Sequence, residues 1–229
     1  MRLGGLMKMT LLDFPGKVGC TVFTVGCGFR CPFCHNASLV THPEEEYPLE
    51  DFFAFIKKRQ GLLDGVCITG GEPLLQPDLA DFIRRIRALG YAVKLDTNGA
   101  HPHGLRALCE EGLLDYVAMD IKNSPARYPE TVGLPAMPQG VAESAAYLLS
   151  GAVPFEFRTT VVEELHDPSD FTEIGKWIAG AERYYLQTFT DSGDLIGTGL
   201  SAPSADKLAA CLAAVQPYVP SATLRGNAK

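Results

Sequence analysis

Short apolar segments alternate with amphipathic helical segments along most of this chain. Six runs rich in apolar or β-branched residues are candidate strands, at 18–25, 65–69, 91–96, 114–120, 155–162 and 183–188. Helical patterns lie between them and after the last one, at 49–60, 77–89, 103–111, 139–149, 168–179 and 204–215. Such α/β alternation predicts a parallel sheet with right-handed crossovers, either doubly wound or rolled into a full or partial barrel.

Length and composition further limit the domain number, the location and the partners expected of this protein. The 229 residues predict a single domain over 1–229, with an exposed connection at 41–48 and a polar, frayed tail from Pro220. No apolar run approaches the roughly 20 residues of a membrane span, and residues 1–10 lack the pattern of a signal peptide, so a cytoplasmic protein is expected. The net charge of −7 argues against a nucleic-acid partner.

Three of the seven cysteines, Cys27, Cys31 and Cys34, fall within eight residues in a C-x3-C-x2-C spacing. This crowding favours ligation over disulfides and a reducing compartment. Three thiolates can hold three irons of a [4Fe–4S] cluster and leave the fourth iron open to a small chelating molecule. The alternative is a zinc site completed by His35, Cys20 or Cys67.

The other cysteines and the histidines carry no comparable pattern. Cys20 and Cys67 lie in predicted strands, and Cys109 and Cys211 lie in predicted helices, where buried inert thiols are the ordinary expectation. His101, His103 and His166 neighbour prolines and are predicted to be exposed turn residues.

Glycine and polar residues lie at the ends of several predicted strands, and one arginine lies on a strand. They are Gly70, Gly71 and Glu72 after the second strand, Asp96 and Asn98 at the end of the third, Asp120 and Lys122 at the end of the fourth, and Arg158 on the fifth. Alternation places Asp120 and Lys122 on one face. Active sites of parallel α/β proteins lie at these carboxyl-terminal strand ends.

The cysteine motif, with the aromatic Phe33 before its last cysteine, resembles the radical S-adenosylmethionine (SAM) enzymes. The resemblance implies a partial (β/α)6 TIM-like barrel, a [4Fe–4S] cluster on Cys27, Cys31 and Cys34, and SAM on the open iron. It also implies SAM contacts for Phe33 and for the strand-end residues above: the Gly70 to Glu72 segment at the amino group, Asp96, Asn98, Asp120 and Lys122 at the ribose and carboxylate, and Arg158 at the carboxylate. Some related enzymes carry a monovalent cation beside the matching aspartates, which makes such an ion a candidate cofactor here.

Within that family, the segments at 13–16, 22–27 and 30–36 resemble glycyl-radical-enzyme activases, closest to the longer form of the anaerobic ribonucleoside-triphosphate reductase activating proteins. The resemblance implies a glycyl radical enzyme as protein substrate and a flavodoxin- or ferredoxin-like electron donor. The alternatives are an activase of a formate acetyltransferase-like enzyme, a radical SAM enzyme acting on a small molecule, and a zinc-stapled binding module without catalysis.

Overall fold

The computed structural model describes residues 1–41 and 46–226, and its centre is one eight-stranded sheet in simple chain order. The strands are β1 (Leu3–Thr10), β2 (Gly19–Thr24), β3 (Gly65–Gly70), β4 (Ala92–Thr97), β5 (Tyr116–Asp120), β6 (Phe155–Val161), β7 (Tyr184–Thr188) and β8 (Thr223–Arg225). Every neighbouring pair from β2 to β8 is parallel, whereas β1 is antiparallel to β2. A doubly wound sheet would reverse its strand order part-way, so this sequential order is that of an open barrel.

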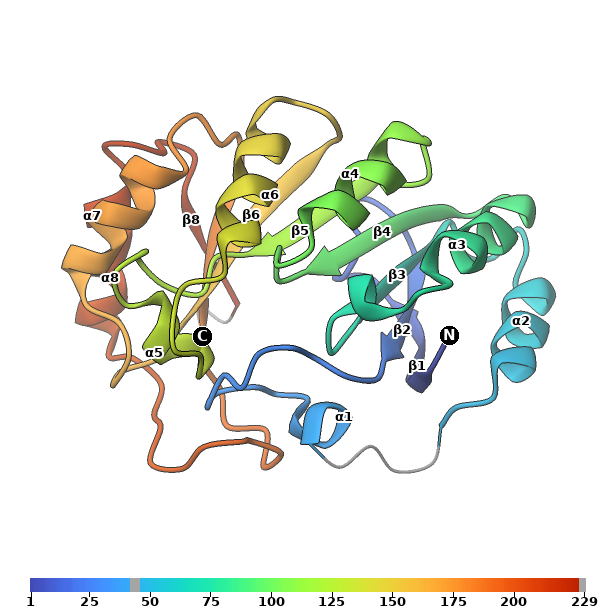
Figure 1. The fold of residues 1–229 in the computed structure, drawn as a ribbon, viewed down its shortest axis with the longest axis horizontal. Coiled ribbons are helices and arrows are strands. Elements are labelled where there is room, and N and C mark those ends of the chain that lie inside the picture. The colour runs from blue at the N-terminus through green and yellow to red at the C-terminus, as the bar shows by residue number, and fades with distance from the viewer. Residues whose placement is uncertain (42–45, 227–229) are drawn as a thin grey trace.

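Helices follow most of the parallel strands and form an arc outside the sheet (Figure 1). They are α2 (Leu49–Lys58), α3 (Leu79–Ala88), α4 (Pro102–Glu110), α6 (Gln139–Leu149), α7 (Pro168–Trp177) and α8 (Ala205–Val215). The shorter helices are α1 (Ala37–Thr41), α5 (Tyr128–Val132) and the 3-10 turn η1 (Pro73–Leu75). None of the helices in the described part of the chain has the length and apolarity needed to cross a membrane.

The two faces of the sheet differ sharply in chemistry. On the outer face, register neighbours on β2 to β5 are fully buried and apolar: Val22, Ile68, Leu95 and Val117. One residue earlier on each strand, the register row on the inner face is Thr21, Cys67, Lys94 and Tyr116. The helices therefore cover the apolar face, and the polar face lines the inside of the open barrel.

The predicted architecture is confirmed, with two additions at its edges. The six predicted strands correspond to β2 to β7, whereas β1 and β8 were not anticipated. The prediction of a frayed tail from Pro220 is wrong up to Gly226, because β8 pairs with β7 and Arg225 forms an ion pair with Glu156. The predicted connection at 41–48 falls in part on residues 42–45, which lie outside the described residues.

Removing the Arg225 guanidinium tests whether this strand is part of the folded core. Glu156 is fully buried and accepts Arg225 Nη2 at 2.8 Å. Arg225→Ala leaves that carboxylate without its charged partner, so we expect the free energy of unfolding to fall by roughly 3 kcal/mol. Urea denaturation measures the change.

Arg183→Ala is the matched control, because Arg183 is exposed and lies on the neighbouring β7 side of the same cluster, 3.3 Å from the Tyr116 hydroxyl. It should change stability by less than about 1 kcal/mol. Equal effects from the two substitutions would mean that β8 adds nothing to the core.

Candidate active site

A cavity opens at the carboxyl-terminal ends of the parallel strands. Its lining includes all but one of the residues predicted from the sequence: Cys27, Cys31, Phe33, Cys34, Gly70, Gly71, Asp96, Asn98, Asp120, Lys122 and Arg158. Glu72 is the exception. Because these residues come from five separate segments of the chain, the fold itself brings them together.

The loop between β2 and α1 carries the three cysteines across this cavity. Backbone hydrogen bonds tie it to remote segments: Gly26 N donates to Leu39 O at 2.9 Å, and Arg30 N donates to Val132 O at 2.8 Å. Pro32 O accepts Gly197 N at 2.8 Å. These bonds hold the loop at its start and through its middle, up to the residue after Cys31.

The cysteine thiols differ in their surroundings. Cys31 is buried, whereas Cys27 and Cys34 are half-buried. Burial raises the pKa of Cys31 to about 12 and raises that of Cys27 above its usual value. Cys27 Sγ is also within reach of two donors, Phe29 N at 3.4 Å and Asn98 Nδ2 at 3.6 Å. Metal ions would displace the thiol protons, and these donors would then face a thiolate.

The glycine pair at the end of β3, Gly70 and Gly71, lies directly against the cysteine loop. Gly71 N donates to Thr24 O at 2.9 Å, and Glu72 N donates to Gly26 O at 2.7 Å. A Cβ atom at Gly71 would stand 2.0 Å from Gly26 O, which no side chain tolerates. Glycine is required at 71 because the two loops touch backbone to backbone.

Glu72 is placed differently from the other predicted residues. Its carboxylate is fully buried and accepts three protein donors: Leu74 N at 3.0 Å, the Thr97 hydroxyl at 2.8 Å and Asn98 N at 2.7 Å. Burial raises its pKa to about 7. The side chain thus fastens η1 to the end of β4 and turns away from the cavity, so a direct contact with SAM stays a prediction.

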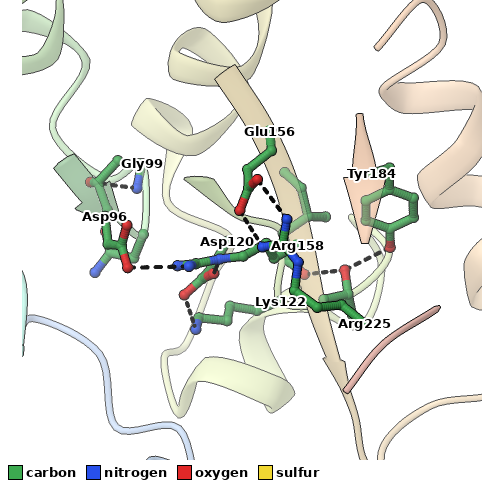
Figure 2. A network of polar contacts seen from close by, with 12 residues as sticks. Asp96, Gly99, Asp120, Lys122, Glu156, Arg158, Tyr184 and Arg225 are labelled. Carbon is green, nitrogen blue, oxygen red and sulfur yellow. Dashed lines mark hydrogen bonds and ion pairs between the residues drawn. The ribbon is translucent and has the colours of Figure 1, made fainter. Parts of the chain in front are cut away.

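A row of charged residues crosses the inner face at the cavity floor (Figure 2). Arg158 Nε donates to Asp120 Oδ1 at 3.0 Å and Arg158 Nη1 donates to Asp96 Oδ2 at 3.1 Å. Lys122 Nζ donates to Asp120 Oδ2 at 2.9 Å, which confirms that Asp120 and Lys122 share a face. Burial alone would raise the pKa of both carboxyls, but the neighbouring cations outweigh it and hold both below their usual range.

Sequence reasoning did not assign a role to Lys94. Its side chain is 1% exposed, and its ammonium is bonded to Asp96 Oδ1 and lies 3.8 Å from Cys67 Sγ. The available signal was strand alternation, since Lys94 and Asp96 are two residues apart on β4. A lone lysine in an apolar strand, facing the same side as a strand-end carboxylate, predicts an ion pair.

The prediction for His166 is wrong. His166 is 1% exposed, its Nδ1 accepts Val162 N at 3.1 Å, and its Nε2 is 2.8 Å from Lys122 O. The ring also contacts Phe33 edge-on, with 6.4 Å between ring centroids. His166 therefore supports two cavity residues from behind, and burial lowers its pKa.

Cys20, Cys67 and Cys211 are buried as predicted, and Cys109 is half-buried. Among residues 1–41 and 46–226, no three His, Cys, Asp or Glu side chains converge closely enough to share one metal ion. A single zinc ion needs such convergence, whereas the cysteines of a cubane each bind a different iron.

Comparisons with known proteins agree with this geometry. The family model described as the Radical SAM superfamily matches residues 21–168. This chain belongs to that superfamily. A “Putative glycyl-radical enzyme activating enzyme” of Methanocaldococcus jannaschii is 30% identical to it over 192 residues, covering 82% of this chain and 79% of that protein.

This radical SAM protein is also similar to a second curated enzyme and to a solved structure. The 7-carboxy-7-deazaguanine synthase of Halobacterium salinarum is 30% identical over 182 residues, covering 75% of this chain and 63% of that enzyme. The crystal structure of a domain of pyruvate-formate lyase-activating enzyme from Bacteroides vulgatus superposes with a TM-score of 0.58 at 20% identity, covering 71% of this chain and 99% of that one. The structural match confirms the fold class.

The residues at the cavity fit the two cofactors of a radical SAM protein. Cys27, Cys31 and Cys34 line one cavity and would hold the cluster irons. Lys122 and Arg158 present positive charge to the same space, which suits the carboxylate of SAM. The backbone at Gly70 and Gly71 carries no side chain that would keep a ligand at a distance.

Gly71→Ala tests the contact between the two loops. The added methyl collides with Gly26 O and must push the cysteine loop away from β3. We expect the dissociation constant for SAM to rise at least ten-fold, about 1.4 kcal/mol, and the iron content after reconstitution to fall. Equilibrium binding and iron analysis measure both.

Gly104→Ala provides the control, since a Cβ there meets only the flexible end of Leu74, at 3.3 Å. That variant should retain the binding and iron content of the unchanged protein. If Gly71→Ala also retains them, the close approach of the loops is unimportant for cofactor binding.

Proposed function

We propose that this protein is a glycyl-radical-enzyme activase, and that anaerobic ribonucleoside-triphosphate reductase is its first candidate partner. When bound, the cluster and SAM supply one electron and a 5′-deoxyadenosyl radical, which removes an α-hydrogen from a partner glycine and leaves methionine and 5′-deoxyadenosine. The observation that carries the proposal is the convergence of the cysteine loop, the glycine pair and the charged row on one cavity. The similarity to the Methanocaldococcus jannaschii protein supports the activase branch.

The chain's own residues have distinct tasks in this proposal. Cys27, Cys31 and Cys34 hold the cluster, while Asn98 and Phe29 donate toward Cys27 Sγ. Lys122 and Arg158 hold the carboxylate end of SAM, and Phe33, 4% exposed, closes the adjoining wall. No side chain has to move a proton, which agrees with the structural placement of His166.

The partner and the electron donor come from the sequence resemblance. Segments at 13–16 and 30–36 support the ribonucleotide reductase assignment, and a formate acetyltransferase-like enzyme is the alternative partner. A flavodoxin- or ferredoxin-like protein would deliver the electron. Thiols free of disulfides and a reducible cluster support a reducing cytoplasm as the location.

The first test is anaerobic production of 5′-deoxyadenosine by the reconstituted, reduced protein with SAM. Cys31→Ala removes the most buried of the three cysteine ligands and should lower the yield by at least about 100-fold, because an incompletely held cluster cannot bind SAM productively. Chromatography of the quenched reaction measures the product. Cys211→Ala, a buried thiol in α8, is the control and should keep the activity.

Adding candidate partners then tests the activase assignment. A glycyl radical signal in electron paramagnetic resonance, on the reductase and dependent on Cys31, would support the proposal. A cysteine-dependent yield of deoxyadenosine with no radical on either candidate partner would refute the assignment while leaving the SAM chemistry intact.

A wall for the protein substrate is available beside the cavity. Met7 of the edge strand β1 pairs in register with Thr21 and therefore faces inward, and it is 46% exposed. Phe23 on β2 is half-buried on the same face and pairs with Thr69, which lines the cavity. An apolar wall continuous with the cofactor cavity, at an edge strand, suits an extended polypeptide carrying the target glycine.

Met7→Lys tests this wall without touching the cofactor site. A charge there should reduce glycyl radical formation at limiting partner concentration by about ten-fold, corresponding to ~1.4 kcal/mol of lost binding. Deoxyadenosine formed without the partner should stay within about two-fold of the unchanged protein. Radical quantification by electron paramagnetic resonance gives the first value and chromatography the second.

Leu62→Lys introduces the same charge at another exposed apolar residue, 65% exposed on the turn before β3. It should leave both measurements unchanged. A loss of radical formation with Leu62→Lys equal to that with Met7→Lys would mean that the effect comes from surface charge and not from the wall.

A small-molecule radical SAM enzyme is the second candidate function. The similarity to the Halobacterium salinarum synthase, over 75% of this chain, favours it specifically. In that case a heterocyclic metabolite would occupy the part of the cavity that SAM leaves open. Substrate-dependent deoxyadenosine with a purified metabolite and no protein partner would decide for this function.

A further inference from the structure

The four carboxylate oxygens of Asp96 and Asp120 are all engaged by side-chain cations. Asp96 Oδ1 meets Lys94, and Asp96 Oδ2 meets Arg158. Asp120 Oδ1 meets Arg158, and Asp120 Oδ2 meets Lys122. A monovalent cation between these aspartates, which the family resemblance raises as a candidate cofactor, would need the same oxygens.

We propose that the guanidinium of Arg158 is a built-in replacement for that cation, so that SAM binding by this protein needs neither Na⁺ nor K⁺. The proposal rests on the proposed function in one respect only, namely that SAM is the ligand of the cavity. It makes no use of the partner protein.

The charge balance opposes a further cation. Two carboxylates face Lys94, Arg158 and Lys122, so the row carries one net positive charge. Behind it, Glu156 and Arg225 form a pair of their own and contribute no net charge. A metal ion entering between the aspartates would be repelled by a guanidinium about 3 Å from each of them.

The strand register explains how one arginine reaches both carboxylates. Arg158 on β6 is the direct register partner of Asp120 on β5. Asp96 lies on β4, which is separated from β6 by β5. The register neighbour of Asp96 on the intervening strand β5 is Ala118. The small side chain of Ala118 leaves the guanidinium room to pass across β5, and its planar fork then meets a different carboxylate with each of two nitrogens.

Arg158 also has a hydrogen-bond donor, Nη2, available for the carboxylate of SAM. In the described part of the chain, Arg158 Nη2 has no protein acceptor. Among the same residues, the Lys122 ammonium donates a hydrogen bond only to Asp120 and also lies 5.8 Å from the centroid of the Phe33 ring. Both side chains line the cavity. A fixed guanidinium and an ammonium can therefore bind the SAM carboxylate directly, the task that a metal ion would otherwise share.

The experiment compares SAM binding to the reconstituted protein in buffers of tetramethylammonium, Na⁺ and K⁺ at equal ionic strength. For the unchanged protein we expect dissociation constants within about two-fold of each other, because the counter-ion is part of the chain. In parallel, ²³Na relaxation should show no broadening beyond that of a bystander protein. This second readout needs neither SAM cleavage nor a partner.

Arg158→Gln removes the positive charge between Asp96 and Asp120. We expect SAM binding in tetramethylammonium to weaken at least ten-fold, with Na⁺ or K⁺ restoring a large part of it, and ²³Na broadening to appear. Arg158→Lys keeps a charge but cannot bridge both carboxylates, and it should show an intermediate loss with little rescue. Arg183→Gln, an exposed arginine outside the row, is the control and should behave like the unchanged protein.

Two outcomes would overturn the proposal. One is a cation requirement, or ²³Na broadening, in the unchanged protein. The other is a folded Arg158→Gln or Arg158→Lys variant, shown by an unchanged circular dichroism spectrum, that binds SAM normally without Na⁺ or K⁺. If SAM fails to bind the unchanged protein in every buffer, the proposed function fails, whereas the sodium measurement still decides for or against the built-in counter-ion.

Discussion

Paired charge on the inner face of the sheet is the interaction on which the rest of this structure depends. An unpaired ion removed from water costs several kcal/mol, so each charge on β4, β5 and β6 must meet a counter-charge. Arg158 meets Asp120 only in the observed register of β5 with β6, and it reaches Asp96 only with β4 on the far side of β5. A slip of one residue would turn these side chains toward the apolar helices, so the pairs that shape the site also fix the register.

Much of this arrangement could be predicted because it follows from two regular features of the sequence. Strand and helix periodicity predicts the six parallel strands, and the rule that active sites lie at carboxyl-terminal strand ends points to Asp96, Asp120 and Lys122. Arg158, in the middle of β6, is indicated only by the family resemblance. The cysteine spacing did the same for Cys27, Cys31 and Cys34, whose loop lies over those strand ends. Local patterns suffice wherever the sequence separation between partners is bridged by a regular β–α unit.

The failures have a common physical cause in contacts between remote or irregular segments. Strand β1 contains Gly4 and Gly5 and joins its partner antiparallel, so neither propensity nor alternation with helices marks it. Strand β8 has three residues and is held by Arg225 on Glu156, 69 residues away. His166 was read from its neighbours Asp167 and Pro168 as a turn residue, but Val162 N and Lys122 O, which satisfy its ring, show that tertiary contact overrides a local turn signal.

The charged cofactor site and the apolar wall proposed for the substrate lie on different parts of the inner face. The charged row and the glycine pair belong to β3 through β6 and are locked by hydrogen bonds within the protein. Met7 and Phe23, on β1 and β2, are placed by the ladder between these two strands, and their apolar side chains remain partly exposed. Met7 takes part in none of the ion pairs of β4 to β6 and in none of the backbone hydrogen bonds that hold the cysteine loop, so its side chain is independent of the cofactor site. Because the sheet is open at β1, the barrel keeps an apolar surface beside the cofactor cavity that a closed sheet would cover.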